Sequence, residues 1–193
     1  MTTTWVVVGL GNPGREYERT RHNVGYLVVE EMARRLGASF ARHRRAHADA
    51  AEAHAFVGTA EHCRVVLVKS RTYMNEIGGP VKAVLDFTKS ENLIVVHDEL
   101  DIPLGALRVK FGGGDNGHNG LRSVRKSLGH GDFFRVRCGV GRPPGRQDPA
   151  DWVLSDFRAA ERPEVQVMVA EAADATEYLM ANDLEATQSR FNR

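Results

Sequence analysis

The sequence predicts a layered α/β domain, with a mixed, mostly parallel, twisted sheet and helices on both of its faces. Short apolar runs typical of buried strands alternate along the chain with segments of helical periodicity, which is the order expected of such a fold. The chain has 193 residues, of which 42% are apolar, enough for one large core. Because the sequence contains no internal repeat, we expect a single domain over residues 1–193.

The first hundred residues predict strands and helices in alternation. Residues 5–8 form an apolar strand that a Gly-Pro-Gly sequence ends. A helix is expected from about Asn23, which can cap it, to Gly37, which can end it. The next elements expected are a hairpin over 48–69, a helix over 79–87 and a strand over 93–96.

The second half continues the same pattern. We expect a strand over 106–111, a loop from Gly112, a helix over 120–128, a strand over 133–140 and a long helix over 162–180. The strand over 133–140 alternates, with its apolar residues on one face and Arg135 and Arg137 on the other.

The composition excludes several classes of protein. No apolar run reaches the roughly 18 residues of a membrane span, and the first residues lack the pattern of a signal peptide. We therefore expect a soluble, cytoplasmic protein without a membrane partner. Cys63 and Cys138 lie in apolar strand-like runs and have no C-x-x-C partner, so they are expected to be core residues and not disulfide or zinc ligands.

The net charge of +1 hides a strong asymmetry. Residues 102–146 carry nine basic and two acidic groups, whereas residues 147–193 carry four basic and ten acidic groups. A polyanion could dock on the basic middle third, although a solvated surface explains the charges equally well.

Residues 9–14, Gly-Leu-Gly-Asn-Pro-Gly, match the G-x-G-x-x-G pattern of dinucleotide-binding loops. Such a loop requires a helix that begins inside the motif, since the N–H groups of its first turn hold the pyrophosphate. Here Pro13 removes a donor, and the expected helix begins only at about Asn23. Glu30 stands where a ribose-binding acid would belong, but it lies well inside that helix. The pattern therefore argues against a dinucleotide site.

Four loops are expected at the carboxyl ends of strands or the start of a helix, where α/β proteins build their sites. They carry His, Asp and Asn side chains and no recognisable Ser or Cys nucleophile, which favours hydrolysis by water with a His base that an Asp orients. The candidates are Asn12, His22, Met74, Asn75, His97, Asp98, His118 and Asn119.

Structural explanations compete with this interpretation. Asn75 and Asn119 could cap the helices that follow them, and His22 could be a surface or capping group. Asp98 and its acidic neighbours could bind a divalent metal, but they lie on one turn and lack distant ligands.

Five ordered segments resemble the bacterial peptidyl-tRNA hydrolase family. They read GLGNPGREYERTRHNVG (9–25), YMNEIGG (73–79), HDELDIPLG (97–105), GGGDNGHNGLRS (112–123) and FRVRCGVGRPPG (134–145). The resemblance extends from residue 5 to the ATQSRFN segment at 186–192. It implies cleavage of the ester that joins a peptide to the 3′ ribose of tRNA, without metal or cofactor.

The resemblance also implies roles for individual residues. His22 corresponds to the catalytic base, Asp98 to the acid that orients it, and Asn12, Asn75 and Asn119 to amides that hold the peptide and place the water. The tRNA, bound through its acceptor stem, 3′ end and 5′ phosphate, is the implied partner, and a monomer is expected. Pocket residues are implied at Tyr17, Tyr73, Met74 and His118, and a clamp for the 5′ phosphate at Lys110 and Arg137.

One departure from the family pattern lies in the glycine-rich loop, where Asp115 and Asn116 replace a small or His-Gly pair. We expect the extra acid to weaken phosphate affinity slightly or to alter loop opening. The main alternative function is an inactive tRNA-binding relative of the same fold, which the presence of His22, Asp98 and Asn12 argues against. A zinc-dependent or nucleophile-dependent peptidase ranks lower because it lacks identifiable ligands.

Overall fold

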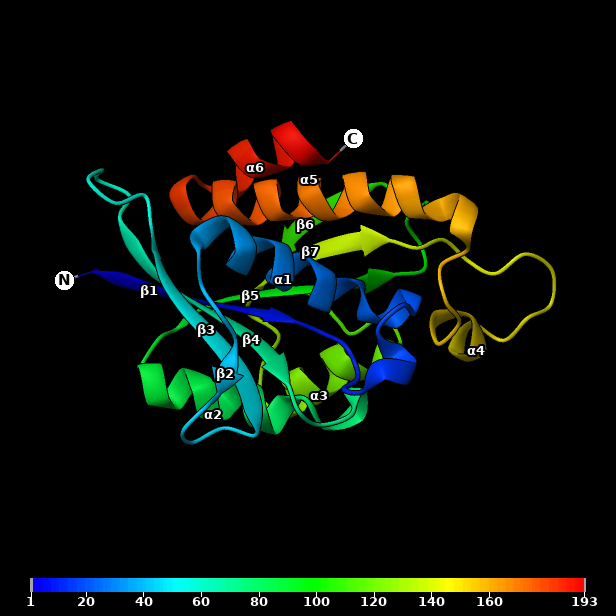
Figure 1. Ribbon diagram of the computed structural model, residues 1–193, viewed down its shortest axis with the longest axis horizontal. Helices are drawn as coiled ribbons and strands as arrows, with labels where there is room; N and C mark the ends of the chain where they lie inside the picture. The colour runs from blue at the N-terminus through cyan, green and yellow to red at the C-terminus, as the bar shows by residue number, and fades with distance from the viewer. Residues whose placement is uncertain (1, 193) are drawn as a thin grey trace.

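The chain folds around a seven-stranded sheet with the strand order β2-β3-β4-β1-β5-β7-β6 (Figure 1). The computed structural model describes residues 2–192. Strands β4, β1, β5 and β7 are mutually parallel, whereas the pairs β2-β3, β3-β4 and β6-β7 are antiparallel. The predicted α/β class is thereby confirmed. The strands are β1 (Thr3–Gly9), β2 (Ala41–Arg42), β3 (Ala48–Ala55), β4 (Cys63–Ser70), β5 (Asn92–Glu99), β6 (Leu107–Phe111) and β7 (Phe134–Gly139).

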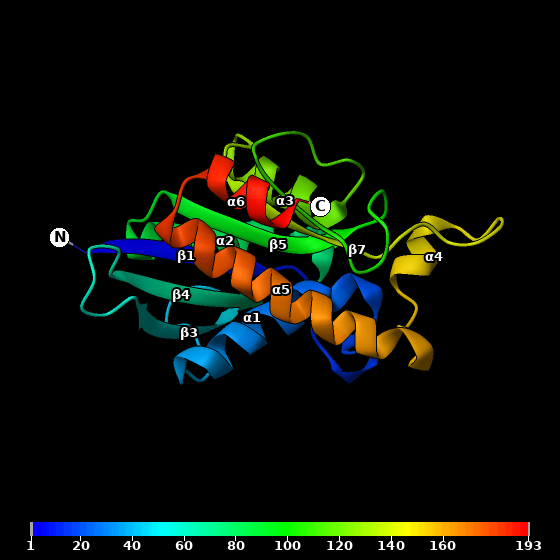
Figure 2. The same ribbon diagram turned by 90° about the horizontal axis from the view of Figure 1, so that it is seen from above.

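Helices cover both faces of the sheet (Figures 1 and 2). One face carries α1 (Val24–Leu36) and α5 (Arg162–Ala181), and α6 (Leu184–Phe191) lies beside α5 over β6. The opposite face carries α2 (Gly78–Thr88) and α3 (Asn119–Leu128), while the short α4 (Pro149–Val153) stands beyond one end of the strands. Within the described residues, no helix is both long and apolar enough to cross a membrane.

The alternation of β1 explains why the sheet needs helices on both faces. Val7 packs into the apolar cluster under α1 and α5, whereas Val6 and Val8 pack into the cluster over α2 and α3. All three side chains are fully buried. A parallel strand covered on both faces reads as a continuous apolar run, which is how it appears in the sequence. Cys63 and Cys138 are buried free thiols, as expected.

The structure corrects the expected role of Asn23. It occupies the N-cap position of α1, but its side chain makes no capping bond and instead holds the backbone of Asn12. The expected end of the helix is confirmed, because Gly37 adopts a left-handed conformation with φ of 66°. The sequence analysis did not anticipate β2, α4 or α6.

The C-terminal helix protects the edge strand β6. The side-chain oxygen of Asn192 accepts a hydrogen bond from the backbone N–H of Val109 at 2.7 Å, and its amide nitrogen donates to the carbonyl of Val109 at 3.1 Å. Gln188 donates to the same carbonyl at 3.0 Å. The edge therefore meets side chains where another strand could otherwise pair.

Helices α2 and α3 approach closely at a glycine. The backbone N–H of Gly78 donates to Oγ of Ser123 at 2.9 Å, and a Cβ placed on Gly78 would overlap the carbonyl oxygen of Ser123. The adjacent Gly79 has open space at the corresponding position. Gly78 is thus required by packing, whereas Gly79 is not.

We expect Gly78→Ala to lower the free energy of unfolding by about 1–3 kcal/mol, because overpacking forces the two helices apart. The matched change Gly79→Ala is expected to raise that free energy by up to about 1 kcal/mol, since alanine loses less backbone entropy on folding. Urea denaturation of both variants measures the difference. Equal stability of the two variants would contradict the packing argument.

Candidate active site

A cavity of about 450 Å³ opens where the chain leaves the carboxyl ends of β1 and β5. Neighbouring parallel strands end at the same edge of the sheet, so the loops that follow them are brought together. Of the twelve residues named above as site candidates, all but His97, Lys110 and Arg137 line this cavity: Asn12, Tyr17, His22, Tyr73, Met74, Asn75, Asp98, His118 and Asn119.

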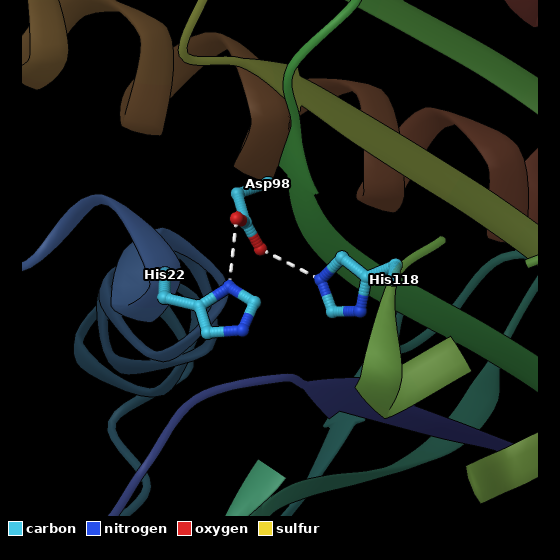
Figure 3. A group of neighbouring side chains, drawn as sticks. All are labelled: His22, Asp98 and His118. Carbon is cyan, nitrogen blue, oxygen red and sulfur yellow. Dashed lines mark hydrogen bonds and ion pairs between the residues drawn. The ribbon is translucent and has the colours of Figure 1, made fainter. Parts of the chain in front are cut away.

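Asp98 lies between two imidazole rings (Figure 3). Its Oδ2 is 2.8 Å from Nδ1 of His22, and its Oδ1 is 2.8 Å from Nε2 of His118. The three side chains come from separate elements: His22 from the 3₁₀ turn Arg21–Asn23 after β1, Asp98 from β5, and His118 from the N-cap of α3. The sequence analysis assigned His118 only to the pocket wall, and the bond to Asp98 had no signal in the sequence.

Hydrogen-bond partners fix the tautomers of both rings. Nδ1 of His118 accepts bonds from the backbone N–H groups of Gly120 and Leu121, so its proton is on Nε2 and is donated to Asp98. Because an ionised carboxylate only accepts, His22 donates to Asp98 from Nδ1. The lone pair of His22 is therefore on Nε2, the nitrogen that faces away from Asp98 (Figure 3).

Burial and charge act in opposite directions on these groups. Burial raises the pKa of Asp98, but the two imidazoles outweigh it and hold that pKa well below its ordinary value of 3.8. Burial lowers the pKa of His22, but the charge of Asp98 and the hydrogen bond to it raise the pKa above the ordinary value of 6.5. His22 is thus a stronger base than a free histidine.

The loop after β1 presents Asn12 in a fixed orientation. Its Oδ1 accepts a hydrogen bond from the backbone N–H of Met74 at 2.7 Å, while its own backbone N–H donates to Oδ1 of Asn23 at 2.8 Å. Asn12 Nδ2 is then the polar atom of this amide that is not used to hold the loop. Since Asn12 lines the cavity, this N–H₂ group is placed as a donor there.

Arg21, which the sequence analysis did not select, joins the His22 turn to α4. Its guanidinium donates to Oγ of Ser155 and to Glu161, both at 2.7 Å, and stacks 3.5 Å from the ring centroid of Trp152. The segment that it anchors supplies the apolar wall of the cavity, made by Pro149, Ala150, Val153 and Leu154. The Asp148-Pro149 pair, an N-cap followed by proline, is the signal in the sequence that marks α4.

Lys110 and Arg137 lie outside the cavity, on the strand pair β6-β7. Both alternate with residues of the apolar core and so face the side of the sheet occupied by α3. Burial and then the charges of Arg137 and Arg135 lower the pKa of Lys110, which indicates that these cations are crowded together. Such a group favours an anionic partner.

Asp115 and Asn116, the departures in the glycine-rich loop, have partners within the protein. The Asp115 carboxylate lies 3.6 Å from Arg122 and 3.4 Å from Arg125. Asn116, with φ of 49°, donates to Asp101 at 2.9 Å. The charge of Asp115 is therefore partly compensated by arginines of α3, which reduces the expected effect on phosphate affinity.

His22, Asp98 and His118 are close enough together to be considered as a metal site, since one ligand atom from each lies within 4.8 Å of the others. Both nitrogens of His118 are engaged, however, one by the N-terminus of α3 and one by Asp98. A metal would have to replace these bonds. The hydrogen bonds account for the cluster on their own.

Comparison with known proteins identifies the family of the chain. The family model described as peptidyl-tRNA hydrolase matches residues 6–193. The chain belongs to this family. It is 53% identical to the peptidyl-tRNA hydrolase of Kineococcus radiotolerans over 100% of this chain and 98% of that protein, and 53% identical to that of Nocardia farcinica over 97% and 95%.

A solved structure extends the likeness to the fold. The crystal structure of peptidyl-tRNA hydrolase from Acinetobacter baumannii is similar, with a TM-score of 0.87 and 31% identity, covering 100% of this chain and 96% of that chain. The family membership inferred from five sequence segments is thereby confirmed.

We expect the imidazole of His22 to titrate above 6.5, because Asp98 stabilises the imidazolium. In Asp98→Asn the charge is lost while burial stays, so the pKa of His22 should fall below 6.5. Imidazole NMR across a pH series measures both values, with the exposed His130 as an internal control. An unchanged His22 pKa in the variant would contradict the assigned interaction.

Proposed function

We propose that the chain hydrolyses the ester that joins a peptide to the 3′ ribose of tRNA, with water as the nucleophile and His22 as the general base. The observation that supports this most directly is the His22 tautomer: Nδ1–H is donated to Asp98, which leaves the Nε2 lone pair to take a proton from water. A positioned base of this kind contributes roughly 10²–10⁴ in rate. Release of the peptide would recycle tRNA from prematurely released peptidyl-tRNA.

Asn12 is the proposed donor to the oxyanion that develops as water attacks the carbonyl. Its Oδ1 is held by the backbone N–H of Met74, so Nδ2 is oriented before the substrate arrives. A donor fixed in advance stabilises a developing negative charge without reorganisation. Asn119 is exposed at the start of α3, and its side chain makes no hydrogen bond within residues 2–192, which favours Asn12 for this role.

The peptide is proposed to lie between amide side chains and the wall formed by α4. Asn75 and Asn119 offer donors and acceptors to the peptide backbone, and Tyr17, Tyr73 and Met74 line the same cavity. A free aminoacyl group would place an ammonium in this cavity, beside the apolar side chains of Val153 and Leu154. Loss of its hydration would disfavour that substrate.

The tRNA is proposed to bind through phosphate contacts at Lys110 and Arg137. Nε of Arg137 is buried and has no hydrogen-bond partner among residues 2–192, and burial lowers the pKa of this guanidinium. A phosphate would supply both the acceptor and the opposite charge. Contacts of this kind read shape and charge, so many tRNAs should be accepted. A cytoplasmic location and a monomeric state stay predictions of the family resemblance. No comparison supports an inactive relative.

The first test uses the purified protein, treated with a chelator, on N-acetyl-aminoacyl-tRNA and on the unacetylated form. We expect rapid cleavage of the acetylated substrate alone, and a loss of roughly 10²–10⁴-fold in kcat for His22→Ala. Thermal melting shows whether the variant is folded. Equal cleavage of both substrates would exclude the proposed selectivity, and chelator-sensitive cleavage would exclude a metal-free reaction.

We expect the rate to follow the protonation of His22. Since the pKa of His22 is raised above 6.5, kcat/KM should fall as the pH decreases through that raised value, because the imidazolium has no lone pair to accept a proton. A pH–rate profile on the acetylated substrate measures this acid limb. An activity that persists well below the pH at which His22 becomes protonated in the NMR titration would show that a different group is the base.

For Asn12→Ala we expect kcat to fall by about 10²–10³-fold, the usual loss when one oxyanion donor is removed. Asn119→Ala should affect KM more than kcat, because its amide is assigned to peptide binding. Steady-state kinetics of the two variants separate these roles. The reverse pattern would transfer the oxyanion role to Asn119.

Arg137→Ala should raise KM for the full-length substrate. The slope of log affinity against log salt concentration should become shallower by about one unit, the change expected when one phosphate contact is lost. A minimal substrate without the 5′ phosphate should be cleaved at nearly the original kcat. Arg34→Ala, which removes an exposed cation on α1, is the control of equal charge. Equal losses on full-length and minimal substrates would exclude a phosphate role for Arg137.

A further inference from the structure

His97 is a buried histidine beside the site that the mechanism above does not use. It precedes Asp98 on β5, is only 1% exposed and does not line the cavity. Along β5 it lies on the same face as Leu93 and Val95, which is the side of the sheet covered by α2 and α3. It therefore cannot touch a substrate in the cavity.

The side chain of His97 makes one hydrogen bond, to the backbone of its neighbour. Nδ1 lies 2.7 Å from the carbonyl oxygen of Asp98. A carbonyl oxygen only accepts, so Nδ1–H is the donor. Nε2 is buried and has no hydrogen-bond partner in the described part of the chain. Burial lowers the pKa of His97 to about 3, so the ring is neutral with its proton on Nδ1.

The carbonyl of Asp98 needs this donor because β1 ends too early to supply one. The carbonyl of Val96 points toward β1 and accepts from the N–H of Leu10. Alternate residues of a strand point their carbonyls the same way, so that of Asp98 also faces the β1 side. On that side, the N–H that would follow Leu10 two residues later is that of Asn12, and it is already donated to Oδ1 of Asn23.

His97 also contacts the second imidazole on Asp98. Its ring lies edge to face against His118, with ring centroids 5.1 Å apart. His118 in turn donates to Oδ1 of Asp98. His97 thus holds the main chain of Asp98 directly, and packs against a ring that holds its carboxylate.

We propose that His97 is a positioning residue of the reaction, which fixes the Asp98 peptide through Nδ1–H so that the carboxylate stays aligned with His22. The inference rests on the proposed function for its effect on rate, but not for its effect on His22. Removing a neutral side chain alters no charge. A change in the protonation of His22 would then report a displaced Asp98.

Two amide substitutions separate the two ring nitrogens. In His97→Asn the side-chain amide can occupy the place of Nδ1, whereas in His97→Gln it can occupy that of Nε2, which has no partner. We expect His97→Asn to keep kcat within about threefold, and His97→Gln to lower kcat by roughly 10–100-fold, the scale of a misplacement near 1 Å. KM should change little in either variant.

The pH dependence supplies a readout that core packing alone would not move. In His97→Gln the acid limb of the rate profile and the NMR titration of His22 should both shift to lower pH, as Asp98 moves away from Nδ1 of His22. The other titratable or charged groups facing these rings are His118 from α3 and Arg135 from β7, with Glu99 at the same cavity, and all are retained. Asp98→Asn gives the full size of the shift.

Any result in which His97→Asn and His97→Gln behave alike would overturn the proposal. That includes equal losses of kcat with an unchanged His22 pKa, which would make His97 a core residue only. The NMR titration requires no substrate, so it decides the role of His97 even if the chain fails to cleave peptidyl-tRNA. Thermal melting of both variants separates a loss of stability from a loss of alignment.

Discussion

The rest of the site depends on the hydrogen bonding of one buried carboxylate, that of Asp98. An ionised carboxylate at 2% exposure is costly unless donors surround it. Two imidazoles meet this requirement, because His22 and His118 donate to its two oxygens, while His97 donates to its backbone carbonyl. Each bond also fixes the tautomer of the ring that makes it. The bond to Asp98 thereby keeps the proton of His22 on Nδ1 and leaves the Nε2 lone pair for chemistry.

The sheet topology brings these partners together. Because β1 and β5 are parallel neighbours, the turn that carries His22 leaves the sheet beside the end of β5. The N-terminus of α3 reaches the same place from the opposite face, and its free N–H groups hold His118. Arg21 ties the His22 turn to the segment after α4. The cavity is thus walled by segments that are far apart in sequence and are joined by a few buried side chains.

The periodic elements and the residue types of the site could be predicted from the sequence, because apolar alternation and strand ends are local patterns. Particular contacts could not. Asn23 is a residue type that commonly caps helices, yet its side chain binds the backbone of Asn12. Which of the two bonds forms depends on a loop eleven residues away. The hydrogen bond between His118 and Asp98 joins residues 20 positions apart, and the bond between Arg21 and Glu161 joins residues more than 130 positions apart. No local pattern specifies such pairs. Lys110 and Arg137, outside the cavity, were reached only through the family resemblance.

The pairing of Asn192 with Val109 has a consequence for the order in which the fold becomes protected from aggregation. Strand β6 carries Lys110 next to Val109, and the outer backbone groups of Val109 are bound by α6 and by the residue that follows it. Until residues 184–192 have packed in place, that backbone edge is open to any extended chain nearby. The surface around Lys110 thus reaches its final form only after residues 184–192 have packed against β6, and loss of that segment would expose a strand edge able to pair with other chains while every catalytic side chain was still present.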